Sequence, residues 1–453
     1  MQEEIFELIT EKKYSKLRSI LCEMNPADIA LILEETTSEE QLPVIFRILP
    51  KELAAETFTY MDADLQEHLI TTFSDAELKA VFDELFLDDT VDIIDEMPAS
   101  VAKRILKHTD AETRKLINQI LAYPDDTAGS IMTTELVDLK RSMTVDEAFD
   151  RIRKIGLDAE TIYTCYVTDR SRRLLGIVTV KDLLLNPKDS LIGDLMDENI
   201  IFATTLDDKE EVANLFDKYD LMALPIVDKE NRLVGIVTVD DAIDVMQEEV
   251  TEDFEKMAAI TPTDDAYLKT GVFSIFKARI PWLMLLMLSA TFTGAIISSF
   301  ESRLTAIPAL IAFIPMLMGT AGNSGSQSSV TIIRSISLGD IEFSDIFKVL
   351  WKEIRISVIC AFTLSIVNFL KMWLVDYKFL NSFDSGKEIL EILVVCIALI
   401  FTVIIAKIIG AVLPIFAKKV GLDPAVMANP IITTIVDAVS LVIYFGVATF
   451  ILM

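Results

Sequence analysis

The sequence predicts a multidomain membrane protein, in which a soluble helical and α/β part precedes a membrane part of five helices. Of the 453 residues, Lys and Arg number 28 against 59 Asp and Glu in residues 1–270, a net charge of −31. Residues 271–453 hold 13 against 11, a net charge of +2. Recurring turn signals and a duplicated segment divide the soluble part further. The two parts therefore suit different surroundings, water for the first and lipid for the second.

Residues 1–125 predict a helical repeat domain, because a turn signal recurs about every 12 residues and helical periods with Leu, Ile and Phe on one face follow it. The signals are Pro26, Ser38, Pro50, Asp62, Ser74, Pro98 and Asp110. Units this short cannot bury an apolar face alone, so we expect them to stack into a superhelical array. An irregular helical bundle is the alternative.

The next two domains, 126–189 and 190–249, contain a duplication: LLGIVTVKDLL at 174–184 and LVGIVTVDDAI at 233–243. Each copy follows a strand and a helix, and this tandem β-β-α module resembles a pair of CBS domains. The resemblance implies that Thr179, Lys181 and Asp182 contact ATP or another adenosine nucleotide. A CBS pair that only holds a dimer or transmits movement is the alternative.

The segment 250–270 predicts an acidic connecting helix that leads to the membrane part. Its acids continue a row of carboxylates at three- or four-residue spacing, Asp241, Asp244, Glu248 and Glu252. The helical domain carries a second row, Asp88, Asp89, Asp92 and Asp95. Two such rows facing each other would bind divalent cations between them. A solvated acidic face is the alternative interpretation.

The membrane domain, 271–453, has five apolar runs, each long enough to cross about 30 Å of hydrocarbon. They are 281–300, 305–330, 352–375, 389–415 and 425–452. Lys and Arg flank alternate ends, which predicts a multi-pass protein of the cell membrane with its N-terminus in the cytosol. The N-terminus also lacks the basic and apolar regions of a signal peptide.

The last run contains one carboxylate, Asp437, which is costly in lipid and therefore marks a functional position. Asn429 and Thr433 precede it on the same side of a helix. Oxygen ligands without Cys or His suit a hard divalent cation. The alternative is that Asp437 pairs with a Lys or Arg of another span, or lies in a helix interface as a hydrogen-bonded polar residue.

The second run is interrupted by a glycine-rich polar segment, PMLMGTAGNSGSQSS at 315–329. Its prominent residues are Pro315, Gly322, Asn323, Gly325 and Gln327. Glycine permits close helix approach, and the two amides can bond across an interface or face a pore. Helix packing alone is the alternative.

Taken together, these motifs resemble the MgtE family of magnesium channels along nearly the whole chain. The resemblance rests on YPDDTAGSIMTTE before the CBS pair, the motif at 315–327 and the Asp-Pro-Ala, Asn-Pro and Asp pattern at 423–437. It implies a homodimer whose pore is lined by the second and fifth spans. Asp437 would supply the pore carboxylate, with Asn429 and Thr433 along the same pore, and Mg²⁺ would be the transported ion.

We hypothesise that intracellular Mg²⁺ closes the channel by binding between the acidic cytosolic domains. The candidate regulatory residues are Asp88, Asp89, Asp92, Asp95, Glu210, Asp217, Asp220, Asp241, Asp244, Glu249, Glu252, Asp253 and Asp423. The acidic surface disfavours nucleic acid, and the sequence indicates no enzyme and no particular protein partner. A proton- or sodium-coupled divalent cation carrier and a membrane-tethered adenylate sensor are the alternatives.

Overall fold

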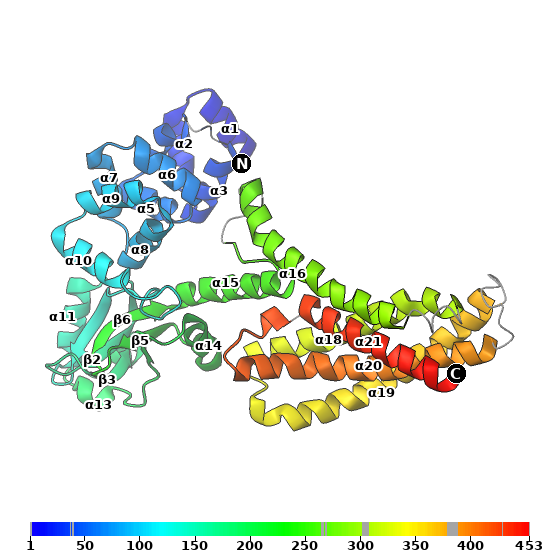
Figure 1. Ribbon diagram of the computed structural model, residues 1–453. Helices are drawn as coiled ribbons and strands as arrows, with labels where there is room; N and C mark the ends of the chain where they lie inside the picture. The colour runs from blue at the N-terminus through cyan, green and yellow to red at the C-terminus, as the bar shows by residue number, and fades with distance from the viewer. Residues whose placement is uncertain are drawn as a thin grey trace. The chain divides into compact units, whose positions relative to one another are not determined.

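The computed structural model describes residues 2–36, 38, 40–263, 267, 270–300, 308–377, 388–427 and 429–452. The chain forms two compact units, Met1–Met246 and Gln247–Met453, each described here by itself. Figure 1 labels their helices and strands. The division falls inside one helix, α15 (Val239–Met257), which continues directly from the second α/β domain.

Short helices make up the first part of the first unit, as the repeat predicts. They are α1 (Gln2–Thr10), α2 (Tyr14–Leu21), α3 (Pro26–Thr36), α4 (Leu42–Phe46), α5 (Lys51–Thr59), α6 (Ala63–Thr72), α7 (Asp75–Phe82), α8 (Leu87–Glu96), α9 (Ala99–His108) and α10 (Ala111–Ile120). From α5 to α10 the helices begin at 51, 63, 75, 87, 99 and 111, so the period is 12 residues. Alternate helices stack, with α5 on α3, α7 on α5 and α9 on α7, around buried side chains such as Phe58 and Leu69.

Two three-stranded sheets follow, one in each half of the duplication (Figure 1). The first half holds β1 (Leu136–Lys140), α11 (Val145–Ile155), β2 (Thr161–Thr168), β3 (Leu174–Thr179), α12 (Val180–Leu185) and α13 (Ile192–Leu195). The second holds β4 (Ala203–Thr204), α14 (Lys209–Tyr219), β5 (Ala223–Val227) and β6 (Leu233–Thr238), and continues into α15. In both sheets the first strand pairs parallel to the second and the second antiparallel to the third. This repeated topology confirms the tandem α/β prediction.

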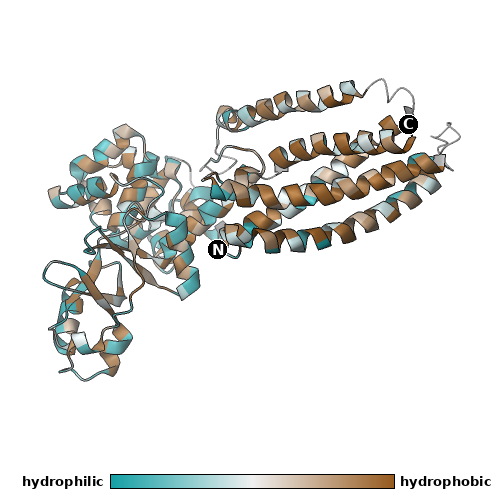
Figure 2. Ribbon diagram, turned by 60° about the horizontal axis from the view of Figure 1, so that its bottom comes forward, coloured by the Kyte–Doolittle hydropathy of each residue, from teal (hydrophilic) through white to brown (hydrophobic). Residues whose placement is uncertain are grey.

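The second unit is helical and mainly apolar (Figure 2). Its elements beyond α15 are α16 (Val272–Ser299), η1 (Pro308–Phe313), α18 (Ile314–Ser337), η2 (Phe343–Asp345), α19 (Ile346–Lys371), η3 (Met372–Tyr377), α20 (Glu388–Lys419), η4 (Ala425–Met427) and α21 (Asn429–Leu452). In the described part, four segments are long and apolar enough to cross a membrane: Val272–Ser299, Phe343–Tyr377, Ile389–Lys419 and Ala425–Leu452. Helix α18 is not one of them, because glycine, serine and amide residues lower its hydropathy. The count of five spans therefore stays a prediction, as do the limits of the individual domains.

Within this unit α18 packs on both α20 and α21, and α19 packs on α20. The hydroxyl of Tyr444 on α21 donates a hydrogen bond to the carbonyl of Leu310 at 2.8 Å, which ties the last helix to the turn before α18. The face of α18 that packs on α20 and α21 is thus shielded from lipid by more apolar neighbours.

Candidate cation sites

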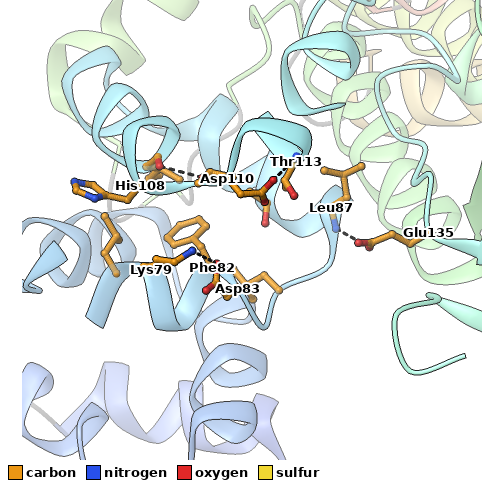
Figure 3. Close-up of a pocket in the computed structure, with 13 residues that line it drawn as sticks. Lys79, Phe82, Asp83, Leu87, His108, Asp110, Thr113 and Glu135 are labelled. Atoms are coloured by element: carbon orange, nitrogen blue, oxygen red, sulfur yellow. Dashed lines mark hydrogen bonds and ion pairs between the residues drawn. The ribbon is translucent and has the colours of Figure 1, made fainter. Parts of the chain in front are cut away.

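The N-terminus of α8 is capped from outside its own repeat. Its N-cap residue, Phe86, has no side chain that can accept a hydrogen bond. The carboxylate of Glu135 instead accepts one from the backbone N–H of Leu87 at 2.9 Å (Figure 3). A carboxylate is stabilised at a helix N-terminus by the helix dipole. This contact places Glu135 beside the first acids of α8.

Three carboxylates meet at that helix end. One carboxylate oxygen from each of Asp88, Glu135 and Glu160 lies within 4.8 Å of the others. Asp88 is only 9% exposed, and Oε2 of Glu160 is buried without a hydrogen-bond partner among the described residues. Three oxygen ligands in this arrangement could hold a hard divalent cation. Neither Glu135 nor Glu160 belongs to an acidic row, so the spacing of acids in the sequence did not predict them as ligands.

The first acids of α15 add to the same negative region. Burial, then the charge of Asp88, raises the pKa of Asp241 to about 7. Burial, then Asp89, raises the pKa of Asp88 to about 7, and burial, then Asp241, raises that of Asp89 to about 6. Burial, followed by Asp88 and Asp89, raises the pKa of Glu160 to about 9. The structure thus brings the beginnings of the two acidic rows together, where a bound cation would offset their repulsion.

The other predicted acids of this unit do not belong to the three-carboxylate group. Asp92 has an exposed side chain, and its pKa is also raised, by partial desolvation and then by Asp241 and Asp88. Asp95 is exposed on the last turn of α8. The remaining ones lie on α14 or α15: Glu210 and Asp217 within α14, Asp220 at its C-cap with a left-handed φ of 51°, and Asp244 within α15.

In the second unit, the end of α15 is held by an ammonium group. Nζ of Lys256 lies 2.5 Å from a carboxylate oxygen of Glu252 and 2.7 Å from one of Asp423. Burial opposes the charge of Lys256, but the hydrogen bonds that its ammonium group donates to Asp423 and Glu252 outweigh burial and raise the pKa of this side chain. Asp253 accepts a hydrogen bond from the hydroxyl of Ser337 at 3.3 Å. Three predicted regulatory acids are therefore grouped here with a lysine that the prediction did not include; Glu249 lies two turns earlier on α15.

Two glycines of α18, Gly322 and Gly325, lie at close helix contacts of the membrane unit. A Cβ at Gly322 would lie 3.3 Å from Cγ2 of Thr433, and one at Gly325 would lie 3.0 Å from Cγ2 of Ile432. A Cβ at Gly410 of α20 would overlap the carbonyl oxygen of Gly325. Both predicted glycines therefore serve close packing, and Gly410 is a partner that the sequence did not indicate.

The amides of the same motif point away from those contacts. Asn323 and Gln327 are exposed on α18, and Pro315 is exposed near its start, whereas Gly322 and Gly325 are buried. On α21, Asp437 is half-buried and has no ion pair among the described residues. The hydroxyl of Thr433 donates to the carbonyl of Pro430 at 3.0 Å. Asn429 begins α21, and its side chain lies outside the described residues.

The two CBS-like motifs form the same local structure. The Thr179 hydroxyl and Asp182 cap α12 reciprocally, with 2.5 Å between Oγ1 and Oδ2. Thr238 donates likewise to Asp241 at 2.7 Å at the start of α15. Lys181 lies between the first pair. In the second copy the aspartate also faces the charge of Asp88 on α8.

A pocket of about 180 Å³ lies beside the capped end of α8 (Figure 3). Apolar side chains such as Phe82 and Leu87 line it together with Lys79, which lies 2.9 Å from Asp83 in an ion pair. Glu135 belongs to its wall and is the one residue that the pocket shares with the three-carboxylate group.

Helical repeats, a CBS-type pair and an apolar helical unit together define a multi-pass membrane protein with a large N-terminal part outside the apolar helices. Family models match each region: a divalent cation transporter model at residues 314–447, the MgtE intracellular N domain at 24–126, and CBS domains at 128–188 and 192–248. The chain belongs to the MgtE family, because curated relatives match it over almost its full length.

Two of these relatives are named magnesium transporter MgtE. The protein of Thermus thermophilus is 35% identical over 98% of this chain and 97% of its own, and that of Bacillus subtilis is 32% identical over 98% and 95%. Among solved structures, the cytosolic domain of the Mg²⁺ channel MgtE in complex with ATP has a TM-score of 0.52 at 34% identity. It covers 54% of this chain and all of that one. The soluble part of a magnesium transporter has a TM-score of 0.51 at 29% identity, covering 55% and 99%.

Proposed function

We propose that this chain transports Mg²⁺ across the cell membrane as a homodimeric channel that cytosolic Mg²⁺ closes. The observation that carries the proposal is the burial pattern of α18: its exposed face bears the polar side chains Asn323 and Gln327, while Gly322 and Gly325 are buried. Lipid would leave those amides without hydrogen-bond partners, so a second copy and a water-filled path are the surroundings that suit them. The names of the full-length relatives agree with Mg²⁺ as the ion.

Asp437 is the proposed ion-binding carboxylate of the path. Gly322 and Gly325 of α18 pack against residues 432–436, so the polar helix adjoins the turn that carries Asp437. Two copies of one carboxylate on a two-fold axis would attract a divalent cation more strongly than a monovalent one. Because Mg²⁺ gives up its water reluctantly, the carboxylates would contact a largely hydrated ion and leave it mobile.

The test is Mg²⁺ flux into lipid vesicles that contain the native chain, the Asp437→Asn variant or the Asp345→Asn variant. We expect Asp437→Asn to lower the flux at least tenfold. Asp345 is a partly exposed acid of the same unit that pairs with Lys348, so its variant should keep native flux. Native flux through Asp437→Asn would refute the assigned pore site. Slow, saturable flux that follows the proton gradient would favour a coupled carrier over a channel.

Closure by cytosolic Mg²⁺ is the second element of the proposal. The grouping of Asp88, Glu135 and Glu160 beside Asp241 supports it, since burial, followed by the charge of neighbouring carboxylates, raises the pKa of Asp88 and of Asp241. Cations bound there would favour the arrangement in which these residues are close. Switching a population from 1:99 to 99:1 requires about 5.5 kcal/mol, which several modest sites acting together can supply.

An adenosine nucleotide at the first CBS motif is the third element. The ATP complex of the similar cytosolic domain supports it. In the second motif, by contrast, Asp241 faces the charge of Asp88, which would repel the phosphates of a nucleotide.

Calorimetric titration of the full chain with ATP tests this element. We expect Asp182→Asn to weaken binding at least tenfold. Asp241→Asn, in the second motif, should leave ATP affinity within about threefold of native. Equal loss in both variants would contradict the assignment to the first motif.

A further inference from the structure

Helices α18, α19 and α20 share a buried polar network inside the membrane unit. Ser328 of α18 is 3% exposed, Glu353 of α19 is 8% exposed and Lys407 of α20 is 6% exposed. The Ser328 hydroxyl donates a hydrogen bond to Oε2 of Glu353 at 2.8 Å, and Nζ of Lys407 donates to the Ser328 oxygen at 3.4 Å. One hydroxyl therefore bridges a carboxylate and an ammonium group.

These charges lie well inside their helices. Glu353 is about two turns from the start of α19, and Lys407 is about three turns from the end of α20. Ionisable groups at such positions are costly in lipid and are retained where they pair with each other or serve a function. Here the two charges compensate each other through Ser328, so the network can persist without an external ion.

The backbones of α18 and α20 touch next to this network. Gly325 and Gly410 form that contact, and they lie three residues from Ser328 and Lys407 respectively. The close crossing brings the serine within reach of the lysine, and the carboxylate on α19 holds the serine from the other side. The rotation of α18 about its own axis is thereby fixed at this level.

Rotation of α18 determines where its amides point. Gln327 directly precedes Ser328, and each residue adds about 100° around a helix, so a turn that moved Ser328 would move Gln327 and Asn323 with it. We propose that Glu353, Ser328 and Lys407 are positioning residues for the transport path, which hold the amide face of α18 in the orientation that selects the cation. This inference rests on the proposed Mg²⁺ transport.

The decisive comparison is Ser328→Ala against Ser329→Ala, measured as the ratio of Mg²⁺ to Mn²⁺ flux in vesicles containing the full chain. Ser329 is the adjacent buried serine, and its hydroxyl has no hydrogen-bond partner in the described part of the chain. We expect Ser328→Ala to change the ratio at least threefold and Ser329→Ala to leave it unchanged. A merely structural role would reduce the amount of folded protein without altering the ratio.

A second set of variants tests the charges. Glu353→Gln and Lys407→Gln each leave one buried charge uncompensated, whereas the double variant leaves none. We expect each single variant to lower Mg²⁺ flux more than tenfold. The Mg²⁺ flux of the double variant should be at least three times that of the less active single variant.

The outcomes separate this inference from the proposed function. If the native chain moves no Mg²⁺ in these vesicles, both fail. If it moves Mg²⁺ but Ser328→Ala keeps the native flux ratio, the positioning role alone is refuted. A double variant no better than the weaker single variant also refutes it, because coupling between the two charges would then be absent.

Discussion

At the scale of single residues, the acids around α8 have higher pKa values than ordinary surface carboxylates. Burial and mutual repulsion raise the pKa of Asp88 and of Asp241 to about 7. In the unfolded chain both would titrate near pH 4. The native state therefore binds more protons than the unfolded state between about pH 4 and pH 7, and its stability falls as pH rises through that window.

We predict that, without divalent cations, the melting temperature of the soluble unit in the full chain falls between pH 5 and pH 8. One pKa unit corresponds to about 1.4 kcal/mol, and 1 kcal/mol moves the melting temperature of a unit this size by about 2–4 °C. We expect a fall of several degrees, measured by scanning calorimetry, and recovery on adding Mg²⁺ that is larger at pH 8 than at pH 5.

Asp88→Asn should flatten this pH dependence, because an amide carries no charge to repel its neighbours. Asp64→Asn, an exposed position on α6, is the matched control and should behave as the native chain does. A melting temperature that stays constant or rises from pH 5 to pH 8 would contradict the assigned pKa directions.

At the scale of elements, α15 ends in a cluster where a lysine takes the place expected for a cation. Lys256 lies between Glu252 and Asp423, and Met257 packs with Ile333 and Ala425. The end of the helix is thus bound to the segment before α21 by charge and by apolar contact. A protonated lysine can neutralise these acids without Mg²⁺. The end of α15 therefore depends less on a bound cation for charge compensation than the acids around α8 do.

Replacing Lys256 with Met should loosen the end of α15 when Mg²⁺ is absent, since Glu252 and Asp423 would then repel each other. The pair is partly exposed, so we expect about 1 kcal/mol, or roughly fivefold faster hydrogen exchange in residues 250–257. Lys256→Arg should retain native exchange, and Lys348→Met should leave this segment unaffected. Identical exchange in Lys256→Met and native protein would show that the ion pair does not hold the helix.

At the scale of the whole molecule, the proposed dimer accounts for polar surface that one chain leaves uncovered. Asn323 and Gln327 are exposed on α18, in a unit whose other long helices expose mainly apolar side chains such as Phe362. Polar side chains facing lipid are disfavoured, whereas they can hydrogen-bond across a subunit contact or line water.

A cysteine at position 327 should therefore form a disulfide between two copies under mild oxidation in membranes. The Cα atoms of two such residues must approach within about 7 Å, which a pore on a two-fold axis permits. Gln327→Cys should give a covalent dimer on non-reducing gels. Phe362→Cys, exposed on α19, should not, and the native chain controls for its own four cysteines. Cross-linking at 362 but not at 327 would place the contact on another face.

The sequence by itself determined the architecture, because its signals are local. The 12-residue spacing of turn residues predicted the helix starts from α5 to α10, and the duplicated GIVTV segments predicted the paired sheets. Only the α8 start lacked a signal, since Phe86 is apolar and the cap comes from Glu135, 48 residues beyond Leu87. Long apolar runs likewise predicted a membrane part, although polar residues keep α18 out of the apolar set.

Only the tertiary structure decided which side chains meet. It brought the carboxylates of Glu160 and Asp88 close together and paired Lys256 with Asp423. It also placed Ser328 between two charged side chains of other helices. No periodicity relates such residues, because each lies on a different element and the contact depends on how those elements pack. Local spacing predicts what an element is and which face it buries, while the partners of a buried charge are chosen by packing, since an uncompensated charge would destabilise the fold.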